Sequence, residues 1–474
     1  MRPSVFSLIV SALALNLYSP AVFADVQYDV RVETRDRVRG GVFGNVKLGS
    51  FGAPGINDQG AVAFAAVVFG QNVGALNNGS VIYQRTKRKS PEMILQTGER
   101  LSSSFRSTIP DNSRYVPGSS RAFRIGRDVA LNRKNQAAFT SEMIYATQTV
   151  SKPDKDDIIT FGDPVDRNYS SYGLGSKRGK NFVVEQTFAF ESFTENRLKT
   201  TLSLNRQGSV GVRALYKIGD KRLEGIAYSG YRLRQGFPDY DGSLISTVES
   251  PVIGLPYFTV FSSFSDPIVS DKNKLFVVAD ISDDGDEFDG IWQGNNPNLQ
   301  PIVVKDTSAP GGGTFASFDG SIGASRKGTT VAFIADVVGA RTNRAVYRAG
   351  VTGKAVTLVV ALGDNAPSNS NVGDLGRFAE LELTAVNNRG EVAVLGGVPG
   401  SRRGTRSGIW ISNRAGDDLR LVVVEGQDLF VDGKVKRITR IAFNPVAGFN
   451  NKSEVAFTAS FSDRTSAVVV ASVK

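Results

Sequence analysis

The chain has 474 residues, carries 56 Lys and Arg against 46 Asp and Glu, and contains neither cysteine nor histidine. The lack of both residue types excludes disulfides, thiolate metal sites, Ser-His-Asp catalysis and the ordinary zinc, copper and haem sites. Fifty glycines and 18 prolines without a collagen-like period predict many turns.

The first 24 residues have the layout of a secretory signal peptide. Arg2 gives a positive start, Val5 to Leu17 is mostly apolar, and small residues precede a cleavage site after Ala24. The apolar stretch is shorter than the roughly 20 residues of a membrane span, although an uncleaved anchor is the alternative. No second apolar run is long enough to cross a bilayer. We therefore expect a soluble mature chain, 25–474, that is secreted or periplasmic.

A motif of the form Asn-x-x-Gly-x-x-x-Phe recurs seven times along the mature chain. Its first residue is Asn or Ser, which can start a turn by accepting a backbone hydrogen bond. Its fourth residue is Gly or Asn, which tolerate positive φ, except for Ser453, the poorest fit. The motif is therefore interpreted as a hairpin turn and not as a ligand site. The copies begin at Asn57, Asn132, Asn205, Ser270, Ser325, Asn387 and Asn450.

Each motif opens a strand that is apolar on both faces. In the first copy Val62 and Phe64 give one face large residues, while Ala61 and Ala63 give the other face small ones. A strand of this kind is typical of burial between two layers. Three further runs rich in Val, Ile, Phe and Tyr follow in most repeats, so the sequence predicts an all-β chain with four strands per repeat.

Seven repeats of four antiparallel strands predict one seven-bladed β-propeller domain spanning residues 25–474. Two strand types follow Asn450 and two precede Asn57, so we expect N- and C-terminal strands to pair and close the ring. A β-solenoid uses far fewer residues per turn, and an array of sandwiches needs about 100 residues per unit. Residues 144–185 fit the repeat worst and are interpreted as an insertion, either functional or merely tolerated.

The sevenfold motif resembles that of bacterial secreted and surface proteins with tandem Asn-x-x-Gly-x-x-x-Phe repeats, the choice-of-anchor tandem-repeat family. The resemblance covers nearly the whole mature chain. Members often end in an anchoring segment, whereas this sequence ends at Ala471 to Lys474 without a hydrophobic tail. The resemblance therefore implies release or free residence in the periplasm, and it implies no catalytic residues.

One dense acidic segment is a candidate metal site. Carboxylates at this density can bind Ca²⁺, although Phe288 stands where an EF-hand loop needs an oxygen ligand. A solvated acidic turn is the alternative. The candidate calcium ligands are Asp283, Asp284, Asp286 and Asp289.

Short basic clusters could meet an acidic polysaccharide, lipid headgroups or nucleic acid. They lack interleaved aromatic residues for base stacking, so solvated loops are the simpler interpretation and we expect no nucleic-acid partner. The clusters are Arg85 to Lys89, Lys177 to Lys180 and Arg402 to Arg406.

Two functions follow from these observations. The first is an exported, non-catalytic monomer that binds a polysaccharide or another surface protein, with no cofactor. The alternative is a carbohydrate-active hydrolase or lyase that uses a pair of carboxylates, with or without calcium. Two or three buried carboxylates converging in one pocket on the ring axis would favour the enzyme, and an axis lined by Ala, Val and Ser would oppose it.

Overall fold

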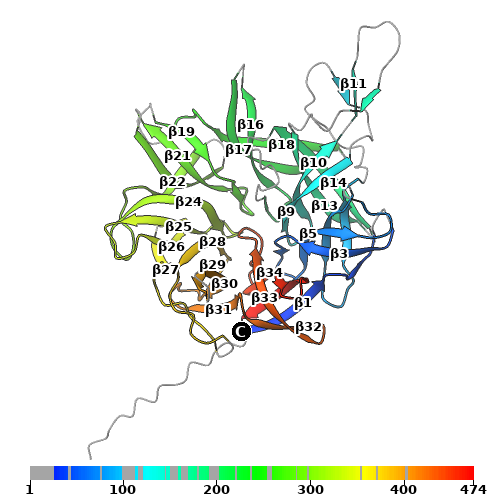
Figure 1. The fold of residues 1–474 in the computed structure, drawn as a ribbon. Helices are drawn as coiled ribbons and strands as arrows, with labels where there is room; N and C mark the ends of the chain where they lie inside the picture. The colour runs from blue at the N-terminus through cyan, green and yellow to red at the C-terminus, as the bar shows by residue number, and fades with distance from the viewer. Residues whose placement is uncertain are drawn as a thin grey trace, which may run out of the picture.

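The structure is a computed structural model. It describes residues 26–40, 44–74, 77–98, 113–115, 121–144, 146–149, 159–161, 169–178, 181–191, 202–218, 221–234, 237–252, 259–283, 286–295, 298–352, 355–369, 372–400 and 404–473. Within these ranges the chain forms β-strands and no helix, as the sequence predicts. The predicted signal peptide lies outside the described residues. Consecutive sheets follow one another in chain order around a common centre (Figure 1).

The sheets of the first half of the chain are built from antiparallel hairpins. The first contains β2 (Arg37–Val38), β3 (Val46–Phe51), β4 (Gly55–Ile56), β5 (Val62–Phe69), β6 (Gly79–Gln84) and β7 (Glu92–Gln96). The second unit contains β9 (Arg121–Leu131), β10 (Ala137–Ile144), β13 (Tyr169–Arg178) and β14 (Asn181–Glu191). The third contains β15 (Ser203–Leu204), β16 (Val210–Ile218), β17 (Lys221–Arg234) and β18 (Phe237–Thr247). The single pair Glu191 and Leu215 joins these last two units into one eight-stranded sheet.

The second half repeats the same plan. The fourth unit contains β19 (Val260–Phe264), β20 (Ile268–Val269), β21 (Leu275–Asp283), β22 (Asp286–Asn295) and β23 (Asn298–Val304). The fifth contains β24 (Thr314–Ala324), β25 (Thr330–Val338), β26 (Arg344–Gly350) and β27 (Val356–Ala361). The sixth contains β28 (Glu380–Val386), β29 (Val392–Pro399), β30 (Thr405–Ser412) and β31 (Leu419–Val424).

The last sheet joins the two ends of the chain. It contains β32 (Asp428–Val431), β33 (Lys434–Phe443), β34 (Glu454–Phe461), β35 (Ser466–Val473) and β1 (Val26–Glu33). The strand β1 pairs antiparallel with β35, from Val26 opposite Val473 to Glu33 opposite Ala467. The expected pairing of the N- and C-terminal strands is therefore present.

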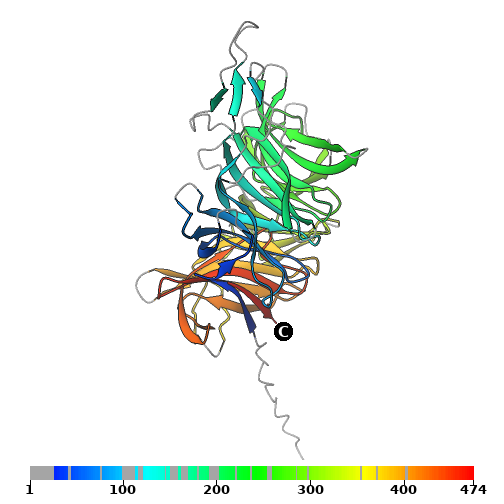
Figure 2. The same ribbon diagram turned by 90° about the vertical axis from the view of Figure 1, so that its right-hand side faces the viewer.

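Part of the segment interpreted as an insertion belongs to the main sheets. Strands β13 and β14, which cover much of 169–191, pair with each other and β13 pairs with β10. A separate three-stranded sheet of β8 (Ser113–Tyr115), β11 (Ala146–Thr149) and β12 (Ile159–Phe161) projects outward beside this unit (Figures 1 and 2). In the described ranges no helix is long and apolar enough to span a membrane.

The motif turns have the geometry that the sequence predicts. The fourth residue of every copy has a φ between 57° and 99°. Ser453 adopts φ 61°, and its hydroxyl donates a 2.6 Å hydrogen bond to the Glu391 carboxylate of the preceding repeat. This bond gives the one serine at this position a role that glycine could not supply.

The asparagine at the first position of five motif copies ties its turn to the next one. Asn57 accepts hydrogen bonds from the N–H groups of Gln59 and Ala61, both at 3.0 Å, and its side-chain amide donates to the carbonyl of Asn132 at 3.0 Å. The same amide-to-carbonyl bond, between 2.9 and 3.2 Å, joins Asn132 to Asn205, Asn205 to Ser270, Asn387 to Asn450, and Asn450 back to Asn57.

The two serine repeats, which lack the amide, are joined by other bonds. The Asp271 N–H donates to the Arg326 carbonyl at 2.7 Å. The Lys327 N–H donates to the Asn388 side-chain oxygen at 2.8 Å. Hydrogen bonds therefore run from each of the seven turns to the next and from the last to the first.

The buried apolar residues form seven clusters, and each cluster joins two successive units. One contains Phe64 of the first sheet together with Ala456 and Val468 of the last, so the series of clusters also connects the two ends of the chain. The motif aromatics Phe64, Phe139, Phe333 and Phe457 are fully buried, as are the small residues Ala63, Ala138, Ala332, Ala393 and Ala456 on the opposite face. The predicted large and small faces are both buried between sheets.

We expect Asn57→Ala to lower the free energy of unfolding by roughly 2–4 kcal/mol, because it leaves buried backbone groups of two turns without partners. Urea denaturation measures this loss. The control is Gln59→Ala on the same turn, where an exposed side chain is removed and stability should change by less than about 0.5 kcal/mol. Equal effects of the two substitutions would contradict the structural role of the asparagine.

Candidate functional site

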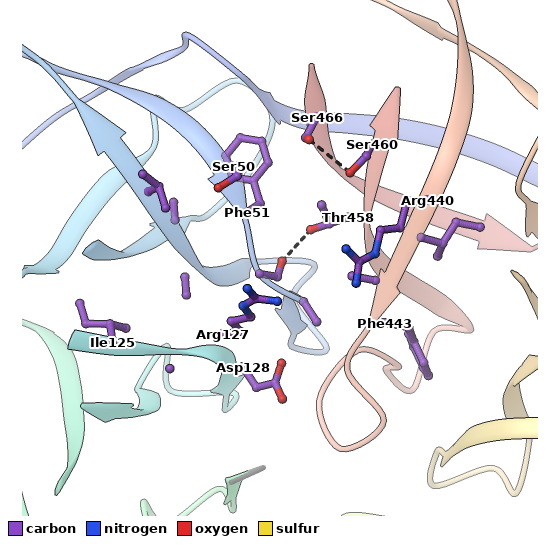
Figure 3. A pocket seen from close by; sticks show the side chains of 18 of the residues that line it. Ser50, Phe51, Ile125, Arg127, Asp128, Arg440, Phe443, Thr458, Ser460 and Ser466 are labelled. Atoms are coloured by element: carbon purple, nitrogen blue, oxygen red, sulfur yellow. Dashed lines mark hydrogen bonds between the residues drawn. The ribbon is translucent and has the colours of Figure 1, made fainter. Parts of the chain in front are cut away.

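A cavity of about 550 Å³ opens near the centre of the molecule, between the first, second, sixth and last units (Figure 3). Its walls come from the strands that precede the motif turns and from the strands that follow them. The lining includes Ser50, Phe51, Ile125, Arg127, Asp128, Arg440, Phe443, Thr458, Ser460 and Ser466.

Glycine lets two of these walls approach closely. A Cβ atom at residue 52 would lie 2.0 Å from the carbonyl oxygen of Arg127, a distance that no side chain tolerates. A Cβ atom at residue 55 would lie 2.4 Å from the carbonyl oxygen of Val129. The first sheet therefore packs backbone to backbone on β9, and this contact fixes where Arg127 and Asp128 enter the cavity.

Three charged side chains line the cavity. Arg127 and Arg440 are exposed to solvent and come from facing walls, whereas Asp128 is half-buried. Burial raises the pKa of Asp128 to about 6; the positive charge of Arg127 opposes this rise, and the negative charge of Asp266 adds to it. The cavity therefore carries a net positive charge at neutral pH, which increases when Asp128 takes up a proton.

The remaining walls offer hydroxyl groups and aromatic rings. The Thr458 hydroxyl donates to the Gly52 carbonyl at 2.7 Å, and the Ser466 and Ser460 hydroxyls lie 3.4 Å apart. Phe51 packs its ring edge-on against the buried Phe64, with centroids 5.5 Å apart. These groups give the cavity both hydrogen-bonding and apolar contacts.

The loop 444–449 lies below the cavity, on the central axis around which the sheets are arranged, and closes the cavity on that side. The Asn444 side-chain oxygen accepts from the N–H groups of Val446 and Ala447, both at 3.0 Å, and its amide donates to the Val129 carbonyl at 3.3 Å. The Ile56 N–H in turn donates to the Ala447 carbonyl at 2.7 Å. The loop is thus held to the first and second units across the axis.

Arg326 crosses the axis nearer the turns. Its guanidinium donates to the carbonyls of Leu131 at 2.9 Å and Ile56 at 3.3 Å, and its burial lowers the pKa of the group. Around it the axis is lined by small and apolar residues, including Ala130, Leu204, Ile268, Val269 and Ala324. The cavity is therefore closed toward the motif turns.

A second charged group lies beside an adjacent, smaller cavity of about 220 Å³ that Asp266 lines. Arg213 lies 3.5 Å from the Asp266 carboxylate and 3.8 Å from that of Glu224. Burial raises the pKa of Glu224, and Arg213 opposes that rise. Among the described residues that line the larger cavity, Asp128 is the one carboxylate. Asp128 and Asp266 therefore line different cavities.

The predicted calcium ligands lie along one hairpin. Asp283 ends β21 and faces Asp286 at the start of β22, while Asp284 lies outside the described residues. The carboxylate of Asp289 accepts a 2.6 Å hydrogen bond from the Phe318 N–H of the next unit. The described residues contain no group of three or more acidic side chains placed to hold a metal ion, and calcium binding at this hairpin stays a prediction.

Arg127, Asp128 and Arg440 are not among the residues predicted from the sequence. One signal was available: Asp128 and Asp266 both stand four residues before the first position of a motif, at Asn132 and Ser270. Equivalent positions in successive repeats lie at the same height on the inner strands. A charged residue at this position therefore indicates a side chain directed at the axis.

No curated protein matches the chain. Solved structures match it only distantly. Trypanosoma rangeli sialidase is 10% identical with a TM-score of 0.35, and the match covers 94% of this chain and 59% of that one. An oligogalacturonate lyase from Vibrio parahaemolyticus is 10% identical with a TM-score of 0.41, over 95% of this chain and 99% of that one.

The β-propeller domain of the Trilobed protease from Pyrococcus furiosus is 9% identical with a TM-score of 0.33, over 79% of this chain and 98% of that one. The chain thus spans little more than half of the sialidase. None of these matches carries an activity over to this chain. A model of a family of unknown function, DUF7453, matches residues 172–474, more than half of the sequence, and the chain belongs to that family.

Proposed function

We propose that the chain is an exported, non-catalytic seven-bladed β-propeller that binds an acidic polysaccharide in the central cavity. Seven apolar clusters between successive units, and hydrogen bonds from each turn to the next, support a closed ring of seven four-stranded blades. The layout of residues 1–24 supports export. The tandem motif supports a place at the cell surface or outside the cell.

The observation that carries the ligand class is the pair Arg127 and Arg440 on facing walls of a cavity lined with hydroxyl groups. A guanidinium binds a carboxylate through two parallel hydrogen bonds, which suits the uronate groups of an acidic sugar chain. The hydroxyls of Thr458 and Ser460 can exchange hydrogen bonds with sugar hydroxyls. Arg326 and the loop 444–449 close the axis, so a polysaccharide cannot pass through the molecule. The cavity would therefore receive an end or a bend of the polysaccharide.

We propose binding without catalysis because the described residues of the cavity wall include one carboxylate and not a pair. Hydrolysis of a glycosidic bond by the usual route needs two carboxylates, about 5–9.5 Å apart, on either side of the bond. Asp128 stands alone among the described lining residues, and Asp266 is held by Arg213.

The alternative is a carbohydrate-active hydrolase or lyase in which Asp128 is the acid. The observation that favours it is the raised pKa of Asp128, since a pKa of about 6 suits a general acid near neutral pH. Asp266 lies near enough to contribute to that rise.

A glycan array that includes uronate-rich and neutral polysaccharides tests the binding proposal. We expect binding to acidic glycans only, and a loss of about tenfold in affinity for Arg440→Ala, which removes one guanidinium from the cavity. Arg437→Ala is the matched control, because Arg437 lies on the same strand and is not among the residues that line the cavity. Binding to no acidic glycan, or equal losses in both variants, would overturn the proposal.

Binding of an acidic glycan should tighten as the pH falls from 7.5 to 5. Protonation of Asp128 near pH 6 removes the one negative charge from the cavity, while a uronate with a pKa of about 3.5 stays ionised. Titration calorimetry at both pH values measures the change. Asp128→Asn should bind tightly at both, and an unchanged pH dependence in this variant would show that another group titrates.

The same substitution should affect stability in one direction only. The pKa of Asp128 is higher in the folded state than in the unfolded state. The contribution of its protonated carboxyl to the free energy of unfolding is therefore complete below about pH 4 and is lost as the pH rises through about 6. Asp128→Asn should therefore raise the melting temperature at pH 7.5 and change it little at pH 4, by differential scanning fluorimetry.

Product analysis separates binding from catalysis. The intact protein is incubated with each acidic glycan that it binds, and new reducing ends and the ultraviolet absorbance of unsaturated products are followed. We expect neither. Products that disappear in Asp128→Asn while binding persists would establish the enzyme instead.

A further inference from the structure

The motif turns place a ring of positive charge at the end of the molecule opposite the cavity. The second and third residues of the seven turns include eight cationic and two acidic side chains, so these 14 positions hold more than half of the net charge of +10. Seven of the cations are exposed: Arg133, Lys134, Arg206, Lys272, Lys327, Arg389 and Lys452. We call these seven residues the basic ring.

The turns hold these residues in one layer. Five of the seven turns are hydrogen-bonded to the next through the amide of the first motif residue, and bonds of the second and third residues join the other two. Asp58 accepts from the Asn451 N–H at 3.0 Å, and Asp271 accepts from the Arg206 N–H at 2.7 Å. The backbone that carries the basic ring is therefore fixed, although its side chains extend into solvent.

Little of this charge is neutralised locally. Among the described residues the basic ring takes part in one ion pair, between Arg389 and Glu391 at 3.7 Å. The two acidic residues of the turns, Asp58 and Asp271, point their oxygens at backbone N–H groups of neighbouring turns. The exposed cations remain available to a partner.

The basic ring and the cavity lie at opposite ends of the inner strands. Asp128 precedes Asn132 by four residues, and Arg440 precedes Asn450 by ten. At about 3.3 Å per residue of strand, Asp128 lies some 13 Å along the strand from the turn. Arg326 and the loop 444–449 separate the two regions along the axis.

We propose that the basic ring docks this protein onto an anionic lipid surface. Cations arranged in one layer around the axis match the flat layer of phosphate groups at a membrane surface. Each cation adds to the electrostatic attraction between the protein and that surface. None of the 14 turn positions is aromatic, so the surface offers no rings on which bases or sugars could stack. Docking in this way leaves the cavity open on the side away from the membrane. The proposal is independent of any ligand in the cavity.

Vesicle co-sedimentation of the mature chain tests it. The vesicles contain phosphatidylcholine alone or with one third phosphatidylglycerol. We expect binding to the anionic vesicles only, weakened as salt is raised. The triple variant Lys134→Glu, Lys272→Glu, Lys452→Glu should bind them about tenfold more weakly or worse. All three side chains are exposed, and circular dichroism checks that the variant folds.

The control variant is Arg88→Glu, Lys89→Glu, Lys434→Glu, which has the same net charge and reverses exposed cations away from the motif turns. It should keep at least half of the wild-type binding. Failure of the wild type to bind anionic vesicles, or equal losses in both triple variants, would overturn the proposal. It would also be overturned if the basic ring bound soluble alginate or DNA but not vesicles, because the partner would then be a polyanion in solution. Glycan binding in the cavity, measured on the same variants, reports separately on the proposed function.

Discussion

The side-chain amide of the motif asparagine is the contact on which the rest of the structure depends. Its oxygen closes its own turn, and its nitrogen donates to the carbonyl of the next turn, as Asn57 does to Asn132. One residue therefore specifies both a local hairpin and the spacing between successive sheets. Buried amides of this kind must be fully bonded to be tolerated, so a turn that misses its neighbour is penalised. Repetition of this residue in five of the seven turns thus sets most of the spacing between successive sheets.

That geometry also places the two candidate functional regions. The strand before each turn lines the axis, so a polar residue four positions before the motif, such as Asp128, reaches the central cavity. The residues inside the turn, such as Lys134, face outward at the other end. Two surfaces of different chemistry therefore arise from neighbouring positions of the same short motif.

The sequence was enough to predict the elements that depend on local physics. Turns with positive φ, strands buried on both faces, and the pairing of the end strands follow from residue type, periodicity and strand order. The cavity does not follow, because it depends on which sheets face one another and on how closely Gly52 lets them approach. The position of Arg326 on the axis also does not follow from the sequence. Its guanidinium donates to the carbonyls of Leu131 and Ile56, which lie far away in the sequence. Non-local contacts of this kind carry no signature in the sequence.

The pairing of β1 with β35 has a consequence for the order of folding. Val26 contacts Val473, so the last sheet cannot form until both ends of the chain are present. Contacts between residues so distant in sequence form slowly, because the entropy of closing a long loop is lost before they are made. During synthesis from the N-terminus, the first strand forms before its partner exists. The chain consequently stays incomplete, with open edges exposed to other proteins, until its final residues emerge.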